Sequence, residues 1–81
     1  MLDRRNDVRV PVNTVGAIKF GAAGHILPCI VIDLTPLGAG LTVASTFGIP
    51  AAFQLTIKGE IQTRYCRVIW AQGNQLGVSF D

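Results

Sequence analysis

The sequence predicts an all-β fold, a six-stranded antiparallel β-barrel, on three observations. Short apolar stretches recur along the chain, and most of them alternate apolar with polar residues. Glycine and proline residues lie between these stretches, where turns are expected. No segment has the apolar spacing of a helix that packs against a core. A barrel is favoured over a sandwich because closing the sheet leaves no exposed edges in a chain of 81 residues.

Three strands are predicted in the first half of the chain. The first runs from about Asn13 to Phe20, and the turn Gly21–Gly24 follows it. The second, His25–Ile32, contains Pro28, which must lie at an edge, at a bulge or early in the strand because proline cannot donate to a ladder. The third strand is predicted over Gly40–Ala44, after a corner between two apolar runs.

Three more strands are predicted in the second half. Ala51–Ile57 alternates cleanly, and Lys58–Glu60 is predicted to form a tight hairpin around a central glycine. The fifth strand, Ile61–Ala71, alternates imperfectly, so we expect a bulge or bend that switches its faces midway. The inward residues of the sixth strand are predicted to be Leu76, Val78 and Phe80.

The composition is that of one folded domain. Hydrophobic residues make up 49% and charged residues 15% of the chain, which is far from the composition of disordered proteins. We expect residues 1–9 to form a mobile arm, residues 10–81 to form the barrel, and no substantial C-terminal helix to follow. The net charge of +2 is small for a surface that binds duplex DNA. No apolar run approaches the ~18 residues of a membrane span, so we expect a soluble, cytoplasmic protein.

Catalytic and metal-binding motifs are not recognisable in this sequence. Cys29 and Cys66 lie within apolar strand patterns, which favours buried free thiols, although neighbouring strands would permit a disulfide. His25 has no cysteine, aspartate or histidine at metal-ligand spacing and is interpreted as an exposed turn residue. We therefore expect no enzyme activity, no metal and no cofactor.

The corner Asp33–Gly38 carries the first candidate binding residues. Asp33 offers carboxylate acceptors and Thr35 a hydroxyl, while Pro36 stiffens the turn and Gly38 permits close backbone approach. Two interpretations remain open at this point. The corner holds a ligand rich in N–H donors, or its side chains bond only to nearby backbone amides.

An arginine cluster near the N-terminus supplies the second set of candidates. Arg4, Arg5 and Arg9 lie together there, whereas the other cations are scattered. Taken alone, such a cluster is a solvated basic arm or an unspecific polyanion site. The placement of these cations fits a small anionic ligand better than duplex DNA, whose phosphates call for a broad basic surface.

Four segments give the chain its resemblance to a known family. Arg5–Arg9 has the form RxxxR, and Asp33–Gly38 has the form DxTxxG. Cys66–Trp70 and Gln75–Phe80 follow in the same order. Together they resemble the PilZ domain family over nearly the whole chain.

The resemblance implies a bacterial receptor module whose ligand is the second messenger cyclic di-GMP. It implies an arm that wraps over the ligand and a corner that lies beneath it. The ligand-binding residues that it implies are Arg4, Arg5, Arg9, Asp33, Thr35 and Gly38. Threonine stands at position 35 where the family usually has serine; the hydroxyl is kept, and the added methyl stiffens χ1.

Two other functions remain open from the sequence. A PilZ-like domain can serve as a protein-interaction scaffold without nucleotide, and even the receptor module is expected to act on a downstream protein partner. The third reading is a barrel that binds a nucleic acid polymer. We disfavour it because the aromatic residues mostly fall on positions predicted to face inward, which leaves no exposed stacking platform.

Overall fold

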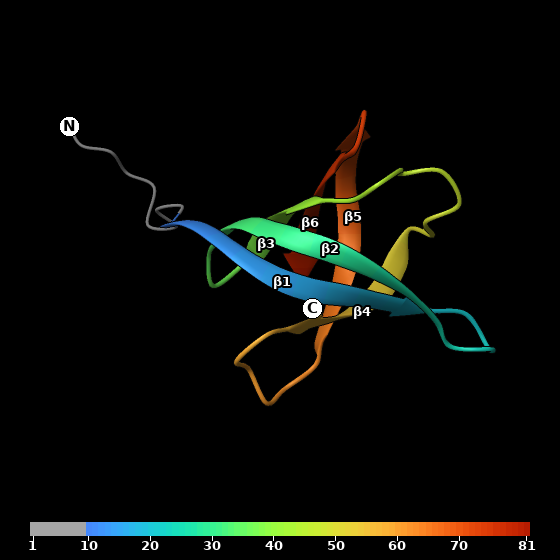
Figure 1. The fold of residues 1–81 in the computed structure, drawn as a ribbon, viewed down its shortest axis with the longest axis horizontal. Helices are drawn as coiled ribbons and strands as arrows, with labels where there is room; N and C mark the ends of the chain where they lie inside the picture. Colours follow the sequence, from blue (N-terminus) through green and yellow to red (C-terminus); the bar gives the residue numbers. More distant parts are fainter. Residues whose placement is uncertain (1–9) are drawn as a thin grey trace.

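The computed structural model describes residues 10–81, whose six strands close into one antiparallel barrel (Figure 1). Their order around the barrel is β1-β2-β3-β6-β5-β4, and β4 pairs with β1 to complete the circle. The described residues contain no helix, and the predicted fold class is confirmed. The strands are β1 (Val10–Phe20), β2 (His25–Leu34), β3 (Gly38–Thr42), β4 (Ala52–Ile57), β5 (Arg64–Gln72) and β6 (Gln75–Phe80).

The longest strand, β1, takes part in two ladders. It pairs with β2 from Val10 opposite Leu34 to Phe20 opposite His25, with a shift in register between Pro11 and Thr14. Only residues 16–19 pair with β4, between Ile57 and Gln54. The first half of β1 therefore lies beside β2 alone, at the end of the ladder that contains the β2–β3 corner.

The barrel interior is filled by the inward residues of all six strands. Alternation places one face of each strand inside, where apolar burial stabilises the fold. A glycine at position 16 keeps the interior from overfilling, because a Cβ there would lie 3.2 Å from the Cys29 sulfur. The buried apolar residues are Ile18, Cys29, Val31, Ala39, Leu41, Val43, Phe53, Leu55, Ile57, Cys66, Leu76 and Val78.

The β4–β5 connection is wider than the predicted tight hairpin. The two strands pair from Leu55 opposite Arg64, so β5 does not begin at Ile61, which is fully exposed in the loop. Within this loop the Glu60 carboxylate accepts two hydrogen bonds from the Arg64 guanidinium, at 3.1 and 3.2 Å. That guanidinium also lies 4.6 Å from the centre of the Phe80 ring and covers one end of the barrel.

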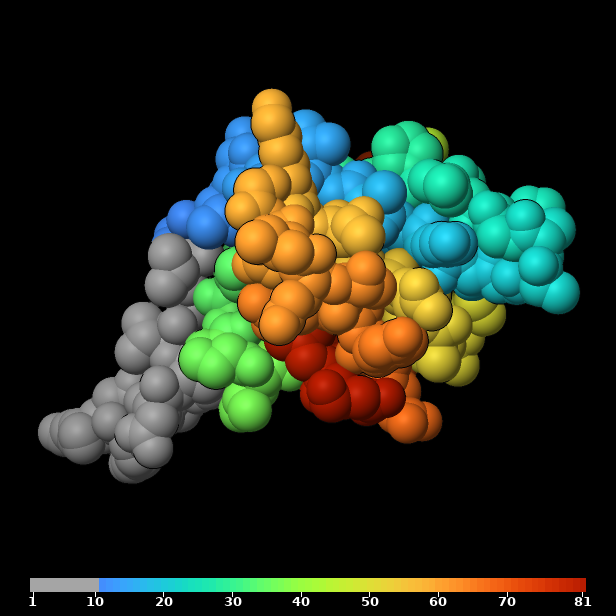
Figure 2. Space-filling view, turned by 90° about the horizontal axis from the view of Figure 1, so that it is seen from below, coloured from blue at the N-terminus to red at the C-terminus, as the bar shows by residue number. Residues whose placement is uncertain are grey.

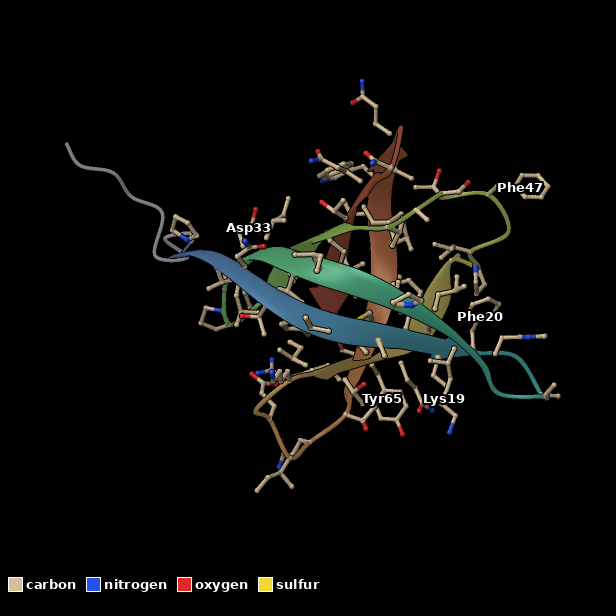
Figure 3. The ribbon with its side chains drawn as sticks, in the orientation of Figure 1. Lys19, Phe20, Asp33, Phe47 and Tyr65 are labelled. Carbon is tan, nitrogen blue, oxygen red and sulfur yellow. The ribbon has the colours of Figure 1, made fainter. Side chains whose placement is uncertain are left out.

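Three aromatic residues are far more exposed than the sequence predicts. The expected bulge in β5 is present between Val68 and Trp70, and it turns Trp70 outward with 45% of its surface exposed. Tyr65 lies on the outer face of β5, and Phe47 projects from the β3–β4 loop (Figure 3). The prediction that the aromatic residues mostly face inward is therefore wrong for these three.

Both cysteines are buried free thiols, as predicted. Burial raises the pKa of the Cys29 thiol to about 11 and that of Cys66 to about 12. His25 is exposed, with its ring 5.6 Å from that of Phe20. Across residues 10–81, no group of histidine, cysteine and acidic residues is placed to hold a metal ion. Within the same range, no helix has the length and apolar character needed to cross a bilayer.

Truncation of a central core residue tests the packing. Leu55 is fully buried, so Leu55→Ala should lower the free energy of unfolding by about 2–5 kcal/mol in urea denaturation. Ile61→Ala is the matched control, since its side chain is exposed and its loss should change stability by less than about 0.5 kcal/mol. Equal effects of the two substitutions would contradict the core described here.

The cysteine pKa values predict a dependence of stability on pH. Both thiols stay protonated in the folded barrel above pH 9.0, where the unfolded chain begins to ionise them. The stability that they contribute is present below pH 9.0 and is lost as the pH rises toward about 11. Urea midpoints measured across this range should fall more steeply for the wild type than for a Cys29→Ala/Cys66→Ala variant. Identical slopes for the wild type and the double variant would contradict the raised pKa values of the two buried thiols.

Candidate ligand site on the outer face of the barrel

The β2–β3 corner is held together by Thr35. Its hydroxyl oxygen accepts hydrogen bonds from the backbone N–H groups of Leu37 and Gly38, each at 3.0 Å. The Thr35 N–H donates to the Gly38 carbonyl at 2.8 Å, and the hydroxyl approaches the same oxygen at 3.3 Å. Only 8% of Thr35 is exposed. The hydroxyl is therefore engaged within the turn, as the local backbone-bonding interpretation predicts for this residue.

Gly38 brings the corner against β6. A Cβ at this position would overlap the carbonyl oxygen of Val78 on the neighbouring strand. A hydrogen bond beside Gly38 also joins the corner to β6: the Phe80 N–H donates to the Leu37 carbonyl at 2.8 Å. Gly38 is the first residue of β3, two residues earlier than predicted, and a larger residue would force the corner away from β6.

Asp33 points outward because β2 has a bulge beside it. Val31 lies opposite Leu41 in the core, whereas Asp33 lies opposite Gly40, the very next residue of β3. Ile32 is therefore an extra residue without a partner on β3. In a regular strand Asp33, two residues after Val31, would face the core with it. The bulge turns Asp33 to the outer face. The half-buried Asp33 carboxylate lies over Gly40, where an added Cβ would be 2.9 Å from one of its oxygens.

Trp70 is aimed outward by the same device on β5. Val68 lies opposite Val78, but Trp70 lies opposite Gly77, so Ile69 is the extra residue of this bulge. The indole lies across the outer face of Gly77, where an added Cβ would overlap the ring nitrogen. Glycine at this position is what allows the ring to lie against the β6 backbone.

The two glycines join these side chains into one site. Gly40 and Gly77 are directly opposite each other in the β3–β6 ladder. Outward positions of such a pair lie about 5 Å apart, so the Asp33 carboxylate over Gly40 and the Trp70 indole over Gly77 lie next to each other. We call this set the glycine strip: Asp33, Gly40, Gly77 and Trp70. It offers a carboxylate acceptor and an aromatic face side by side.

The first strand leads directly to the glycine strip. Pro11 lies opposite Asp33 in the β1–β2 ladder, and Val10 lies opposite Leu34. In Figure 3, Asp33 lies at this end of the ladder, beside the beginning of β1. The predicted residues Arg4, Arg5 and Arg9 lie outside the described residues. Their connection is fixed by the chain, since Arg9 immediately precedes Val10 and each residue spans at most ~3.5 Å.

One of the four residues of the glycine strip was predicted from the sequence. Asp33 was a candidate, whereas Trp70, Gly40 and Gly77 were not. The signals that could have found them are the glycines between inward residues of two strands, Gly40 beside Leu41 and Gly77 beside Leu76. Joining them requires the register between β3 and β6, which no local pattern contains.

The fold and the site define a small β-barrel domain with candidate binding residues on its outer wall. The comparison with known families gives this class a name. The chain belongs to the PilZ domain family, whose family model matches residues 3–81. PilZ domains are binding modules rather than enzymes, and cyclic di-GMP is their general ligand. No curated protein matches the chain.

The placement of Trp70 over Gly77 can be tested by fluorescence, because the chain has a single tryptophan. Gly77→Ala should push the indole off the strand into water and shift its emission maximum to longer wavelength. Ser79→Ala changes the same outer face of β6 without touching the indole and should leave the emission unchanged. An unshifted spectrum in folded Gly77→Ala would exclude the packing described.

Proposed function

We propose that this protein binds cyclic di-GMP on the glycine strip, with the arginine arm closing over the ligand. The observation that carries the proposal is the juxtaposition of the Asp33 carboxylate and the Trp70 indole over the paired glycines Gly40 and Gly77. The beginning of β1 lies opposite Asp33 in the β1–β2 ladder, so the chain joins the three arginines to the Asp33 end of this surface. Family membership supports the same ligand.

Asp33 and Trp70 suit the two sides of a guanine base. The Watson–Crick edge of guanine presents N1–H and N2–H₂ donors, which complement the two acceptor oxygens of a carboxylate. The indole offers a flat apolar surface for a base face, and such stacking contributes about 1–3 kcal/mol per base. The paired glycines beneath them let the carboxylate and the indole lie close to the strands.

The arginine arm supplies the charge that the described part of the site lacks. Arg5 and Arg9 form the RxxxR pair, and Arg4 precedes it. A guanidinium forks onto phosphate oxygens or onto the O6 and N7 atoms of guanine, and it also stacks on purines. Closing of the arm over the ligand would order these residues and reposition any segment joined to them, which is how a receptor module would act on a downstream protein.

Thr35 and Gly38 act as positioning residues in this proposal. The Thr35 hydroxyl bonds the backbone of its own turn, and Gly38 sets the corner against β6. Serine and threonine provide the same hydroxyl, so threonine at position 35 keeps the turn that presents Asp33. We expect the extra methyl of threonine to lower the affinity for the ligand only slightly, because the hydroxyl makes no contact that the methyl would block.

Calorimetric titration of cyclic di-GMP into the full chain tests the proposal. We expect saturable heat for the wild type and at least about a tenfold loss of affinity in Arg5→Ala, Arg9→Ala and Asp33→Ala. Trp70→Ala should weaken binding by a similar factor, whereas Thr35→Ser should retain it.

The control for charge is Lys58→Ala, which removes a cation from the exposed turn after β4 and should bind like the wild type. Wild-type affinity in both arginine variants would refute the role of the arm. Absence of any heat from the folded wild type would refute ligand binding and favour the protein-interaction scaffold.

A further inference from the structure

A hollow that is separate from the glycine strip lies at the other end of the β1–β2 ladder from Asp33. It opens where β1 leaves β4, because their pairing ends at Lys19 opposite Gln54 and the chain turns at Gly21. Figure 2 looks onto the face where the end of β1, β4 and the beginning of β5 come together. The hollow has a volume of about 400 Å³, within the ~300–1,000 Å³ range of small-molecule sites.

The polar rim of this hollow follows one row of the barrel. Lys19 lies opposite Gln54, and Gln54 lies opposite Tyr65, so three neighbouring strands present these side chains together. Figure 3 shows Lys19 and Tyr65 on the same side of the molecule, far from Asp33. The row offers an ammonium group, an amide and a phenol hydroxyl within reach of one ligand.

The floor of the hollow is apolar. Phe20 and Phe53 would be the next pair of the β1–β4 ladder, but the strands have parted there. Their rings and Pro50 line the opening that results. An apolar floor with a few polar groups on its rim is the usual character of a small-molecule site.

The charges at the rim favour an anion. Across residues 10–81, Lys19 forms no ion pair. The one acid that lines the hollow, Asp81, lies 3.5 Å from the Arg67 guanidinium, which offsets its charge. Lys19 is therefore a cation at this opening that has no carboxylate partner among residues 10–81.

We propose that this hollow binds a small aromatic carboxylate. The ring lies against Phe20, Phe53 and Pro50, and the carboxylate accepts hydrogen bonds from Lys19 and from the Gln54 or Tyr65 side chain. The site is independent of the glycine strip, because it lies at the opposite end of the β1–β2 ladder.

Amide NMR of the ¹⁵N-labelled full chain, with benzoate as the probe, tests this inference. Saturable shifts should occur at Gly21, Ala52 and Gln54, and benzamide, which has the same shape without the charge, should bind at least about tenfold more weakly. Lys19→Gln should remove this preference for benzoate. Lys58→Gln is the matched control and should retain it, because Lys58 lies in the exposed turn after β4.

Three results would overturn the inference. The first is the absence of saturable shifts up to about 20 mM benzoate. The second is wild-type benzoate binding by folded Lys19→Gln, and the third is a set of shifts centred on Asp33 instead of Gln54. Because the probe contains no phosphate or purine, neither a positive nor a negative result bears on cyclic di-GMP binding.

Discussion

Closure of the sheet by β1 is the constraint on which both ends of the molecule depend. Its second half is held between β2 and β4, whereas residues 10–14 lie beside β2 alone. That division leaves the beginning of the strand next to Asp33, and Arg9 immediately precedes this strand in the sequence. At the other end β1 parts from β4 after Lys19, which opens the hollow. One strand, bonded on two sides for part of its length, therefore determines where both candidate sites lie.

Two bulges aim a carboxylate and an indole to the outer wall of the closed barrel. In a regular strand Asp33 would share the face of Val31, and Trp70 that of Val68, both directed toward the core. A carboxylate placed there without partners would cost several kcal/mol of desolvation. One extra residue in each strand turns both side chains outward, and the paired glycines of β3 and β6 accommodate them. The outer face is thus specified by the irregularities of the sheet, while its regular alternation specifies the core.

The fold was predictable from sequence because alternation and turn residues are local signals. Leu55 and Leu76 could be assigned to the interior from their neighbours alone. The width of the β4–β5 loop was not predictable, because it follows from the register of the two strands, which pair only from Leu55 opposite Arg64. The outward direction of Trp70 was harder still to predict. It depends on the position of a bulge, and that position follows from pairing with β6, a relation between distant residues. The sequence therefore led to Asp33 but not to its aromatic neighbour.

Threonine at position 35 acts indirectly, because it stabilises the turn of the corner and the turn positions the residues around it. Its hydroxyl meets two backbone donors of its own turn, and its side chain is almost fully covered. Any residue with a hydroxyl at that position keeps the turn, and the turn keeps Gly38 against β6. The β2–β3 register then fixes Asp33 over Gly40. In this arrangement the two bulges aim Asp33 and Trp70 outward, and the threonine and glycine of the corner determine where Asp33 points.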